Sequence, residues 1–222
     1  WRQTLRDEEL RLYLLLVVLA VTIITLSKWL EAGDLSEHGF RASLFNVVSM
    51  MSTTGFTTED FLMWPHLTWI ILLTMGVIGS CSGSTAGGVK VVRILTAVKI
   101  IRNEFRHLLH PRAVLSLRIN QDKLGIDVVQ SIFAYTCFFI LLLTIGVSTL
   151  IIMGLPMFDA LGLSISAYSN VGPGLGYEIG PLDSWSALPD GGLYVTSILM
   201  IVGRLEIFAF IIPFVPSFWR EY

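Results

Sequence analysis

The chain has 222 residues, of which 54% are hydrophobic and only 14% are charged. Soluble domains carry about 25% charged residues, so this composition excludes an ordinary soluble protein and indicates a membrane protein. The net charge of -2 is uninformative as a sum, and we expect no nucleic-acid partner.

Four stretches of the chain contain no Asp, Glu, Lys or Arg, namely 12–27, 61–89, 128–158 and 191–203. A helix needs about 20 mostly apolar residues to cross a bilayer. The first stretch extends helically past Lys28, and the last continues beyond Arg204 and Glu206 to Trp219. The pattern therefore predicts an all-α membrane protein with at least four spanning helices.

Basic residues gather on one side of these predicted spans. Of the 15 Lys and Arg residues, 12 lie before the first span, between the second and third, or at the far end. Acidic residues dominate the opposite ends of the spans, where the basic residues are Lys28 and Arg41. Short loops rich in Lys and Arg stay in the cytoplasm, so we expect both termini and the central basic segment to be cytoplasmic.

Two segments repeat with a period of 117 residues. "FRASLFNVVSMMSTTGF" (40–56) aligns without gaps on "MFDALGLSISAYSNVGP" (157–173). Each has about 10 to 12 helix-compatible residues and then a Ser-x-x-Gly turn, which is too short to cross about 30 Å of hydrocarbon. We predict a re-entrant helix in each, so that the unit of outer helix, re-entrant pore helix, turn and inner helix occurs twice.

The turns "STTGF" and "SNVGP" are suited to holding a dehydrated cation. Backbone carbonyls can replace an ion's water shell, and Gly55 and Gly172 permit backbone dihedrals that other residues resist. The C-terminal end of each short helix favours a cation at the turn. Ser, Thr, Asn and Gly also end helices in ordinary proteins, so simple helix termination stays open for each turn.

The glycine-rich segment "GSCSGSTAGGVK" (79–90) suggests a phosphate loop at first. A Walker loop needs Lys and Ser or Thr directly after its second glycine, but Val89 follows Gly88. The segment begins about 22 Å along a helix from the outer surface, so we predict a broken inner helix at 79–88 that lies beneath the turns. Close helix packing of small residues is the alternative.

Arg204 is predicted about 18 Å deep in the last span, where an ionisable residue is a functional hypothesis by default. We expect it to add an electrostatic barrier and to hold the glycine-rich loop; pairing with a neighbouring helix for structure alone is the alternative. The basic segment 91–123 has helical spacing and is either a lipid-facing extension or a docking surface.

Five motifs in this order resemble the C-terminal half of the TrkH and KtrB potassium-uptake family, and most closely its TrkH branch. They are "STTGFTTEDFLMWP", "GSCSGSTAGGVKVVRIL", "SNVGPGLG", "GRLEIF" and "PSFW". The resemblance implies half of a four-repeat, potassium-channel-like pore, with repeat three at 1–110 and repeat four at 111–222. The sequence is then a fragment, and the missing repeats lie N-terminal to it or in a second polypeptide.

The resemblance also implies the roles of particular residues. Potassium is coordinated by two sets of turn residues: Thr53, Thr54 and Gly55, and Asn170, Val171 and Gly172. The gate is formed by the loop glycines and the inner-helix arginine: Gly79, Gly83, Gly87, Gly88 and Arg204.

The resemblance further implies a multi-pass protein of the bacterial inner membrane, a homodimer of complete subunits, and control by a cytosolic TrkA- or KtrA-like nucleotide-binding ring. Potassium is the transported ion, and no nucleotide is expected to bind this chain. The sequence thus favours a gated potassium-conducting subunit rather than an enzyme. Sodium-coupled potassium uptake and a non-conducting membrane scaffold stay open as alternatives.

Overall fold

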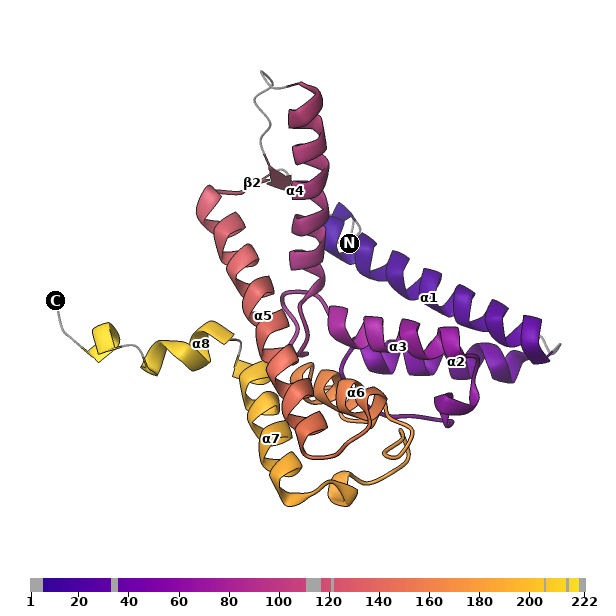
Figure 1. The fold of residues 1–222 in the computed structure, drawn as a ribbon. Coiled ribbons are helices and arrows are strands. Elements are labelled where there is room, and N and C mark those ends of the chain that lie inside the picture. The colour runs from indigo at the N-terminus through magenta and orange to yellow at the C-terminus, as the bar shows by residue number, and fades with distance from the viewer. Residues whose placement is uncertain are drawn as a thin grey trace.

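The computed structural model describes residues 6–32, 36–110, 117–120, 122–205, 207–214 and 216–219. Its helices are α1 (Glu8–Ala32), α2 (Glu37–Met51), α3 (His66–Ile78), α4 (Val91–Leu109), α5 (Ile126–Ile152), α6 (Met157–Tyr168), α7 (Asp190–Leu205) and α8 (Ile207–Ile211) (Figure 1). Short 3-10 turns occupy Phe61–Met63, Trp185–Ala187, Ile212–Phe214 and Pro216–Trp219. A small antiparallel hairpin, β1 (Arg118–Ile119) with β2 (Asp122–Lys123), was not predicted. The predicted helical class is otherwise confirmed.

Among the described residues, two helices are long and apolar enough to cross a membrane, α1 and α5. They contain 25 and 27 residues, or about 38 and 40 Å at 1.5 Å per residue. Large apolar side chains on both helices point outward, such as Val18 (63% exposed) and Phe133 (72% exposed). Such exposure suits a lipid environment, where apolar side chains need no cover. The predicted extension of the first helix past Lys28 is confirmed.

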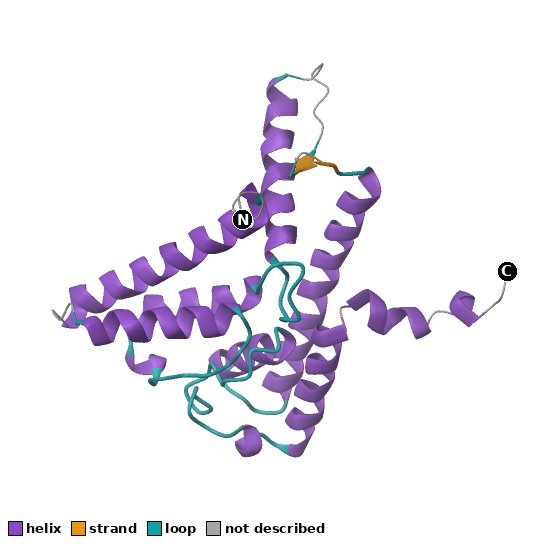
Figure 2. Cartoon of the chain, turned by 180° about the vertical axis from the view of Figure 1, so that it is seen from behind, coloured by secondary structure: helices purple, strands orange, loops and turns teal. Residues whose placement is uncertain are grey.

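The two helical segments that follow the turns are each interrupted. The first stops at Ile78 and resumes as α4 at Val91, so the predicted break is confirmed, with the restart two residues after the expected Val89. The second ends at Leu205, and α8 leaves it in a different direction (Figures 1 and 2). The predicted single span to Trp219 is therefore wrong. Beyond α8 the chain continues as the 3-10 turns that contain Pro213 and Pro216, which lack the backbone N–H of a regular helix. Glu206 lies outside the described residues.

Six of the eight described helices form two groups of three. α1 packs on α2 and α3, and α5 packs on α6 and α7. The groups meet where α3 contacts α6. There the Trp69 ring stacks on Phe158 with centroids 4.1 Å apart, and Trp69 Nε1 donates to the Leu175 carbonyl at 2.7 Å. Val171 and Leu175 of the second group are buried in the core of the first, so the segment after α6 joins the groups.

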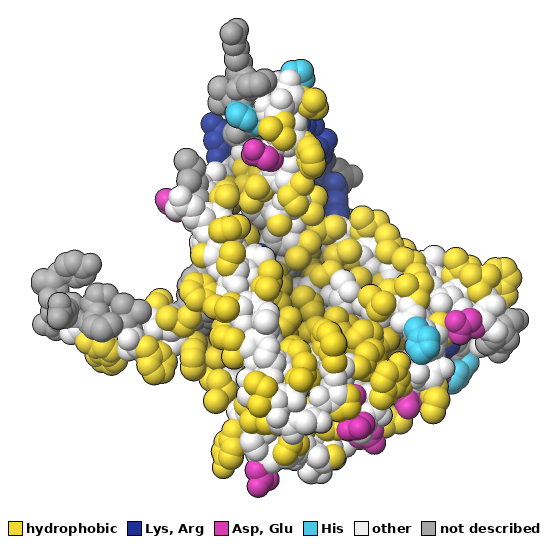
Figure 3. All heavy atoms as spheres, in the orientation of Figure 1, with side chains coloured by type: hydrophobic (Ala, Val, Ile, Leu, Met, Phe, Trp, Pro, Cys, Tyr) yellow, Lys and Arg dark blue, Asp and Glu magenta, His cyan; other side chains and the backbone are white. Residues whose placement is uncertain are grey.

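Charged side chains separate along the molecule. Figure 3 shows Lys and Arg gathered around α4 at the upper end, and most Asp and Glu at the opposite, lower end. Hydrophobic side chains cover most of the surface between these ends. Most basic and most acidic side chains therefore lie at opposite ends of the molecule, as their positions in the sequence indicate.

Candidate functional site

The turns after α2 and α6 have the same backbone hydrogen bonds. In the first turn, the N–H groups of Ser52, Thr53 and Thr54 donate to the carbonyls of Val48, Met50 and Ser49 at 2.8, 3.2 and 2.9 Å. In the second, Ser169, Asn170 and Val171 donate to Ile165, Ala167 and Ser166 at 2.8, 3.1 and 3.0 Å. Every donor and acceptor of the first turn has its counterpart 117 positions later. The two segments therefore repeat in backbone geometry as well as in sequence.

Left-handed residues recur at matching positions of the two turns. Thr53 and Asn170 have φ of 53° and 55°, and Gly55 and Gly172 have φ of 79° and 110°. Non-glycine residues with positive φ are uncommon, and the strain of about 1–3 kcal/mol persists where surrounding structure imposes it. A left-handed residue directly after a helix, with these hydrogen bonds, also occurs at ordinary helix C-termini, so simple helix termination stays open for each turn.

The two turns touch at Gly55. A Cβ atom on Gly55 would lie 2.2 Å from the Val171 carbonyl oxygen, so only glycine fits. The matching position behaves differently, since nothing lies within 4 Å of a Cβ built on Gly172. One side of the paired turns is therefore closed by contact and the other is open in this chain.

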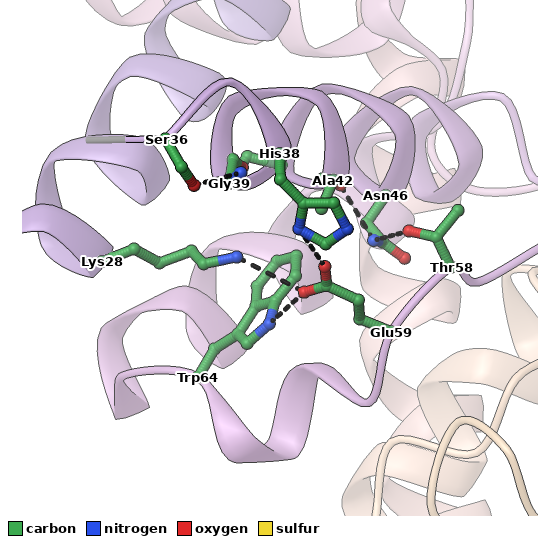
Figure 4. A network of polar contacts seen from close by, with 10 residues as sticks. Lys28, Ser36, His38, Gly39, Ala42, Asn46, Thr58, Glu59 and Trp64 are labelled. Atoms are coloured by element: carbon green, nitrogen blue, oxygen red, sulfur yellow. Dashed lines mark hydrogen bonds and ion pairs between the residues drawn. The ribbon is translucent and has the colours of Figure 1, made fainter. Parts of the chain in front are cut away.

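Side chains around Glu59 brace the first turn (Figure 4). Its carboxylate accepts hydrogen bonds from Lys28 Nζ at 3.4 Å and Trp64 Nε1 at 3.0 Å, and lies 3.2 Å from His38 Nδ1. The Lys28 ammonium also lies 3.9 Å from the Trp64 ring centroid. These contacts tie the segment after the turn to α1, α2 and the start of α3.

The second turn is braced from α6 itself. Ser166 Oγ donates to the Pro173 carbonyl at 2.6 Å and accepts from Gly172 N at 3.3 Å. Asp159, which is 2% exposed, accepts from the N–H groups of Glu178 and Ile179 at 2.8 and 3.3 Å. These side chains hold the backbone that leaves the turn.

The loop 79–90 is pinned at its base by backbone hydrogen bonds. Val89 N donates to Val77 O and Lys90 N to Ile78 O, both at 2.8 Å. Gly79 and Gly88 have φ of 72° and 78°, and a Cβ on Gly79 would lie 2.4 Å from the Gly87 carbonyl oxygen. Gly79, Gly87 and Gly88 allow the chain to reverse its direction where the two ends of the loop pack closely together.

The loop reaches both turns. Ser80 Oγ donates to the Met51 carbonyl at 3.0 Å, and Gly87 N donates to Thr53 Oγ1 at 3.3 Å. A Cβ on Gly87 would lie 2.1 Å from the Ser169 carbonyl oxygen. Figure 2 shows these loops gathered between α3 and the α5–α7 group. The structure thus brings Gly79, Gly87 and Gly88 next to the turns.

Gly83 and Arg204 stand apart from these contacts. No atom lies within 4 Å of a Cβ built on Gly83. Arg204 lies in the last turn of α7 with an exposed side chain, and no hydrogen bond or ion pair joins it to another described residue. The structure therefore does not bring Arg204 to the loop within this chain.

Lys90 contacts Ser84, and the sequence did not predict this contact. The sequence places it near the cytoplasmic end of the span, but it is 8% exposed and its Nζ donates to the Ser84 carbonyl at 2.5 Å. Lys90 has a positive φ of 75° at the start of α4, and its side chain is directed back toward the loop.

The contact between Glu9 and Ser82 was also not predicted from the sequence. Its carboxylate accepts from Ser82 N at 2.6 Å and from Ser82 Oγ at 2.9 Å. The partners lie 73 positions apart, and no local pattern in the sequence links them. Within the described ranges, no group of three His, Cys, Asp or Glu side chains that could hold a metal ion converges.

Comparison with known proteins identifies the family. Residues 5–221 match the family model "TrkH: Cation transport protein". The chain is 35% identical to the Trk system potassium uptake protein TrkI of Halomonas elongata and 32% identical to TrkH of Escherichia coli. These alignments cover 98% and 97% of this chain but 44% of each relative, so the chain spans less than half the length of the curated relatives it matches.

A solved structure agrees with this result. The crystal structure of the potassium transporter TrkH from Vibrio parahaemolyticus superposes with a TM-score of 0.88 at 32% identity. It covers 97% of this chain, which corresponds to 46% of the crystallised chain. Sequence and fold together show that the chain belongs to the TrkH family of cation transport proteins.

Proposed function

We propose that this chain forms half of the pathway of a potassium transporter, with its two turns as filter elements. The observation that carries the proposal is the repeated turn geometry, with Gly55 of one turn against Val171 of the other. Carbonyl and hydroxyl oxygens can replace the ion's hydration shell. The names of the relatives, potassium uptake proteins, support potassium as the ion.

The proposed ion ligands are oxygens of both turns: Thr53, Thr54, Gly55, Asn170, Val171 and Gly172. α2 and α6 act as re-entrant pore helices whose C-terminal ends favour a cation. At 15 and 12 residues, each is about 18–23 Å long and shorter than a bilayer core.

An uncovered face on α2 supports the proposal that half of the pore lies outside this chain. A groove of about 460 Å³ runs along α2 and is lined by Leu44, Phe45, Val48 and Phe56, among others. The matching face of α6 is covered by α3, where Trp69 stacks on Phe158. By this analogy, an inner helix from another repeat covers the α2 groove in the complete protein.

The whole protein then has four units, of which 1–110 and 111–222 are the third and fourth. The relatives' greater length supports further repeats outside this sequence. We propose a homodimer of complete subunits in the bacterial inner membrane, with the two ends of this half in the cytoplasm. The basic helix α4 is the proposed docking surface for a TrkA- or KtrA-like cytosolic ring, which would bind the regulatory nucleotide itself.

The loop 79–90 is the proposed gate. Its contacts with Thr53 and Ser169 put it directly beside both turns. Gly79, Gly83, Gly87 and Gly88 give it the freedom to move, and Arg204 adds a positive barrier on the ion path and hydrogen-bond donors that hold the loop once the protein is complete.

The test of conduction is rubidium flux into proteoliposomes that contain the full-length protein. Flux that requires the protein and needs no sodium gradient supports conduction through a filter. Flux that appears only with a sodium gradient identifies sodium-coupled uptake instead. Absence of flux from correctly folded protein would support the scaffold alternative.

The test of the gate compares a loop glycine with a glycine outside the loop. Gly87→Ala places a methyl group against the Ser169 carbonyl, whereas Gly125→Ala meets open space at a negative φ. We expect Gly87→Ala, Arg204→Ala and deletion of 79–88 to raise flux several-fold, and Gly125→Ala to leave it unchanged. Unchanged flux in the first three variants, at normal expression, would contradict the gate.

A further inference from the structure

The start of α1 carries two adjacent glutamates that contact different parts of the molecule. Glu9 holds Ser82, near the tip of the loop 79–90, through both carboxylate oxygens. Glu8 contacts α4 and the hairpin that follows it: its carboxylate accepts from Lys99 Nζ and from Asn120 N, and its own N–H donates to Asn120 Oδ1 at 2.9 Å.

The helix end that presents these glutamates is itself fixed. Asp7 Oδ1 accepts from the N–H groups of Glu9 and Leu10 at 2.7 and 3.4 Å, so it caps α1. Lys99 Nζ also donates to the Arg118 carbonyl at 2.7 Å, which joins α4 to β1. Glu8 and Glu9 are therefore neighbours on one capped turn, and a movement of that turn displaces both contacts together.

Among the described residues, the base of the loop is held by backbone hydrogen bonds, and Glu9 is the one carboxylate that contacts its tip. The base is hydrogen-bonded to the end of α3, whereas Gly83 beside Ser82 has open space around it. Hydrogen bonds to an ionised carboxylate are roughly twice as strong as neutral ones. The Glu9 carboxylate is thus well placed to hold the loop tip in its observed position.

We propose that Glu9 is a latch for the loop 79–90 and that Glu8 couples this latch to α4, so that displacement of α4 releases the loop. This inference rests on the proposed function, since it concerns the control of the same gate. It assigns the holding of the loop tip to Glu9, a positioning residue on an outer helix, in addition to any role of Arg204.

The loop offers its own reporter, because Cys81 is a free cysteine directly before Ser82. In the full-length protein with its other cysteines replaced, alkylation of Cys81 by N-ethylmaleimide measures exposure of the loop. Because the thiolate is the reactive form and Glu9 acts on it electrostatically, rates are compared at the high-pH plateau, where the thiol is fully ionised in every variant. We expect Glu9→Ala and Ser82→Asp each to raise this rate and the rubidium flux, on the order of tenfold for loss of one charge-assisted pair. Glu31→Ala, at the other end of α1, removes the same charge from an exposed position and should match the wild type.

A charge exchange separates direct contact from a folding defect. Glu9→Lys combined with Ser82→Asp restores an ion pair, so the alkylation rate should return to within about twofold of the wild type. Equal alkylation rates in Glu9→Ala and Glu31→Ala, or failure of the exchange to lower the rate below that of Ser82→Asp, would overturn the latch.

The link to α4 is tested in the same assay. Glu8→Ala and Lys99→Ala should each raise the alkylation rate, and the double variant should be no faster than the faster single one. A double variant showing the product of two independent effects would overturn the coupling. If the wild type carries no rubidium flux, the proposed function fails, while Cys81 alkylation still decides the latch.

Discussion

The two turns have one backbone geometry but opposite means of support. Glu59, which follows the first turn, accepts from donors on the surrounding helices. At the second turn the carboxylate is Asp159 on the helix, and the donors are backbone N–H groups of the segment after the turn. Nine of the twelve residues of α6 are buried, against seven of the fifteen in α2. The shared feature is therefore the turn, and its support depends on which neighbours are present.

The largest expected effect concerns the turn glycines. Gly55→Ala should lower rubidium flux of the full-length protein at least about 100-fold, because its Cβ would meet the Val171 carbonyl at 2.2 Å in a left-handed residue. We expect Gly172→Ala to be equally severe, since a ring of four turns would fill the space that is open in this chain. Gly125→Ala, which meets nothing within 4 Å at a negative φ, is the control. Tolerance of Gly172→Ala would argue against the ring.

The next effect compares the two carboxylates. Asp159→Ala leaves two backbone N–H groups without an acceptor at a buried site and should cost about 3 kcal/mol of stability. Glu59→Ala should cost about 1 kcal/mol, because the side chains of Glu59 and Lys28 are 25% and 20% exposed and solvent screens the pair. Thermal unfolding of the detergent-solubilised full-length protein measures both, with Glu104→Ala on the exposed face of α4 as the control. A larger loss for Glu59→Ala would reverse the comparison.

A matched pair of serines should show a smaller difference. Ser166 Oγ makes two hydrogen bonds, so Ser166→Ala should cost about 1–2 kcal/mol. Its counterpart Ser49 has a buried hydroxyl without a partner among the described residues, and Ser49→Ala should change stability by less than about 0.5 kcal/mol. Equal losses in the same unfolding experiment would mean that a segment beyond this chain binds Ser49.

The smallest expected effect is at His38. Its side chain is 69% exposed beside Glu59, and exposed ion pairs contribute about 0.2–1 kcal/mol. His38→Ala should therefore lower the free energy of unfolding by no more than about 0.5 kcal/mol, with Lys28→Ala costing more because it also loses the contact with the Trp64 ring. The reverse order in thermal unfolding would contradict this view of the brace.

Local patterns explain what could be predicted from the sequence. The long helices α1 and α5 follow from long apolar runs, and the break after Ile78 follows from clustered glycines in one such run. The paired turns were found by aligning two segments 117 positions apart, and their backbone hydrogen bonds do repeat. Each of these features depends on residues close together in the chain, or on comparison of one segment with another.

The unpredicted features depend on which segments meet. From its position in the sequence, Lys90 was expected near the cytoplasmic end of the span. Its contact with the Ser84 carbonyl depends on its positive φ and was not predicted. The departure of α8 from α7 and the small hairpin after α4 also had no clear sequence signal. In each case the local sequence permits more than one path of the backbone, and contacts with other segments select one of them.

By itself, the sequence determined the long helices, the repeated short helix with its turn, and the glycine-rich loop, because apolar length and glycine placement act locally. Only the tertiary structure decided that Gly55 meets Val171, that the loop contacts both turns, and that Glu9 holds Ser82. Those contacts join groups far apart in the chain, where hydrogen bonding and close packing select one arrangement after the helices have formed.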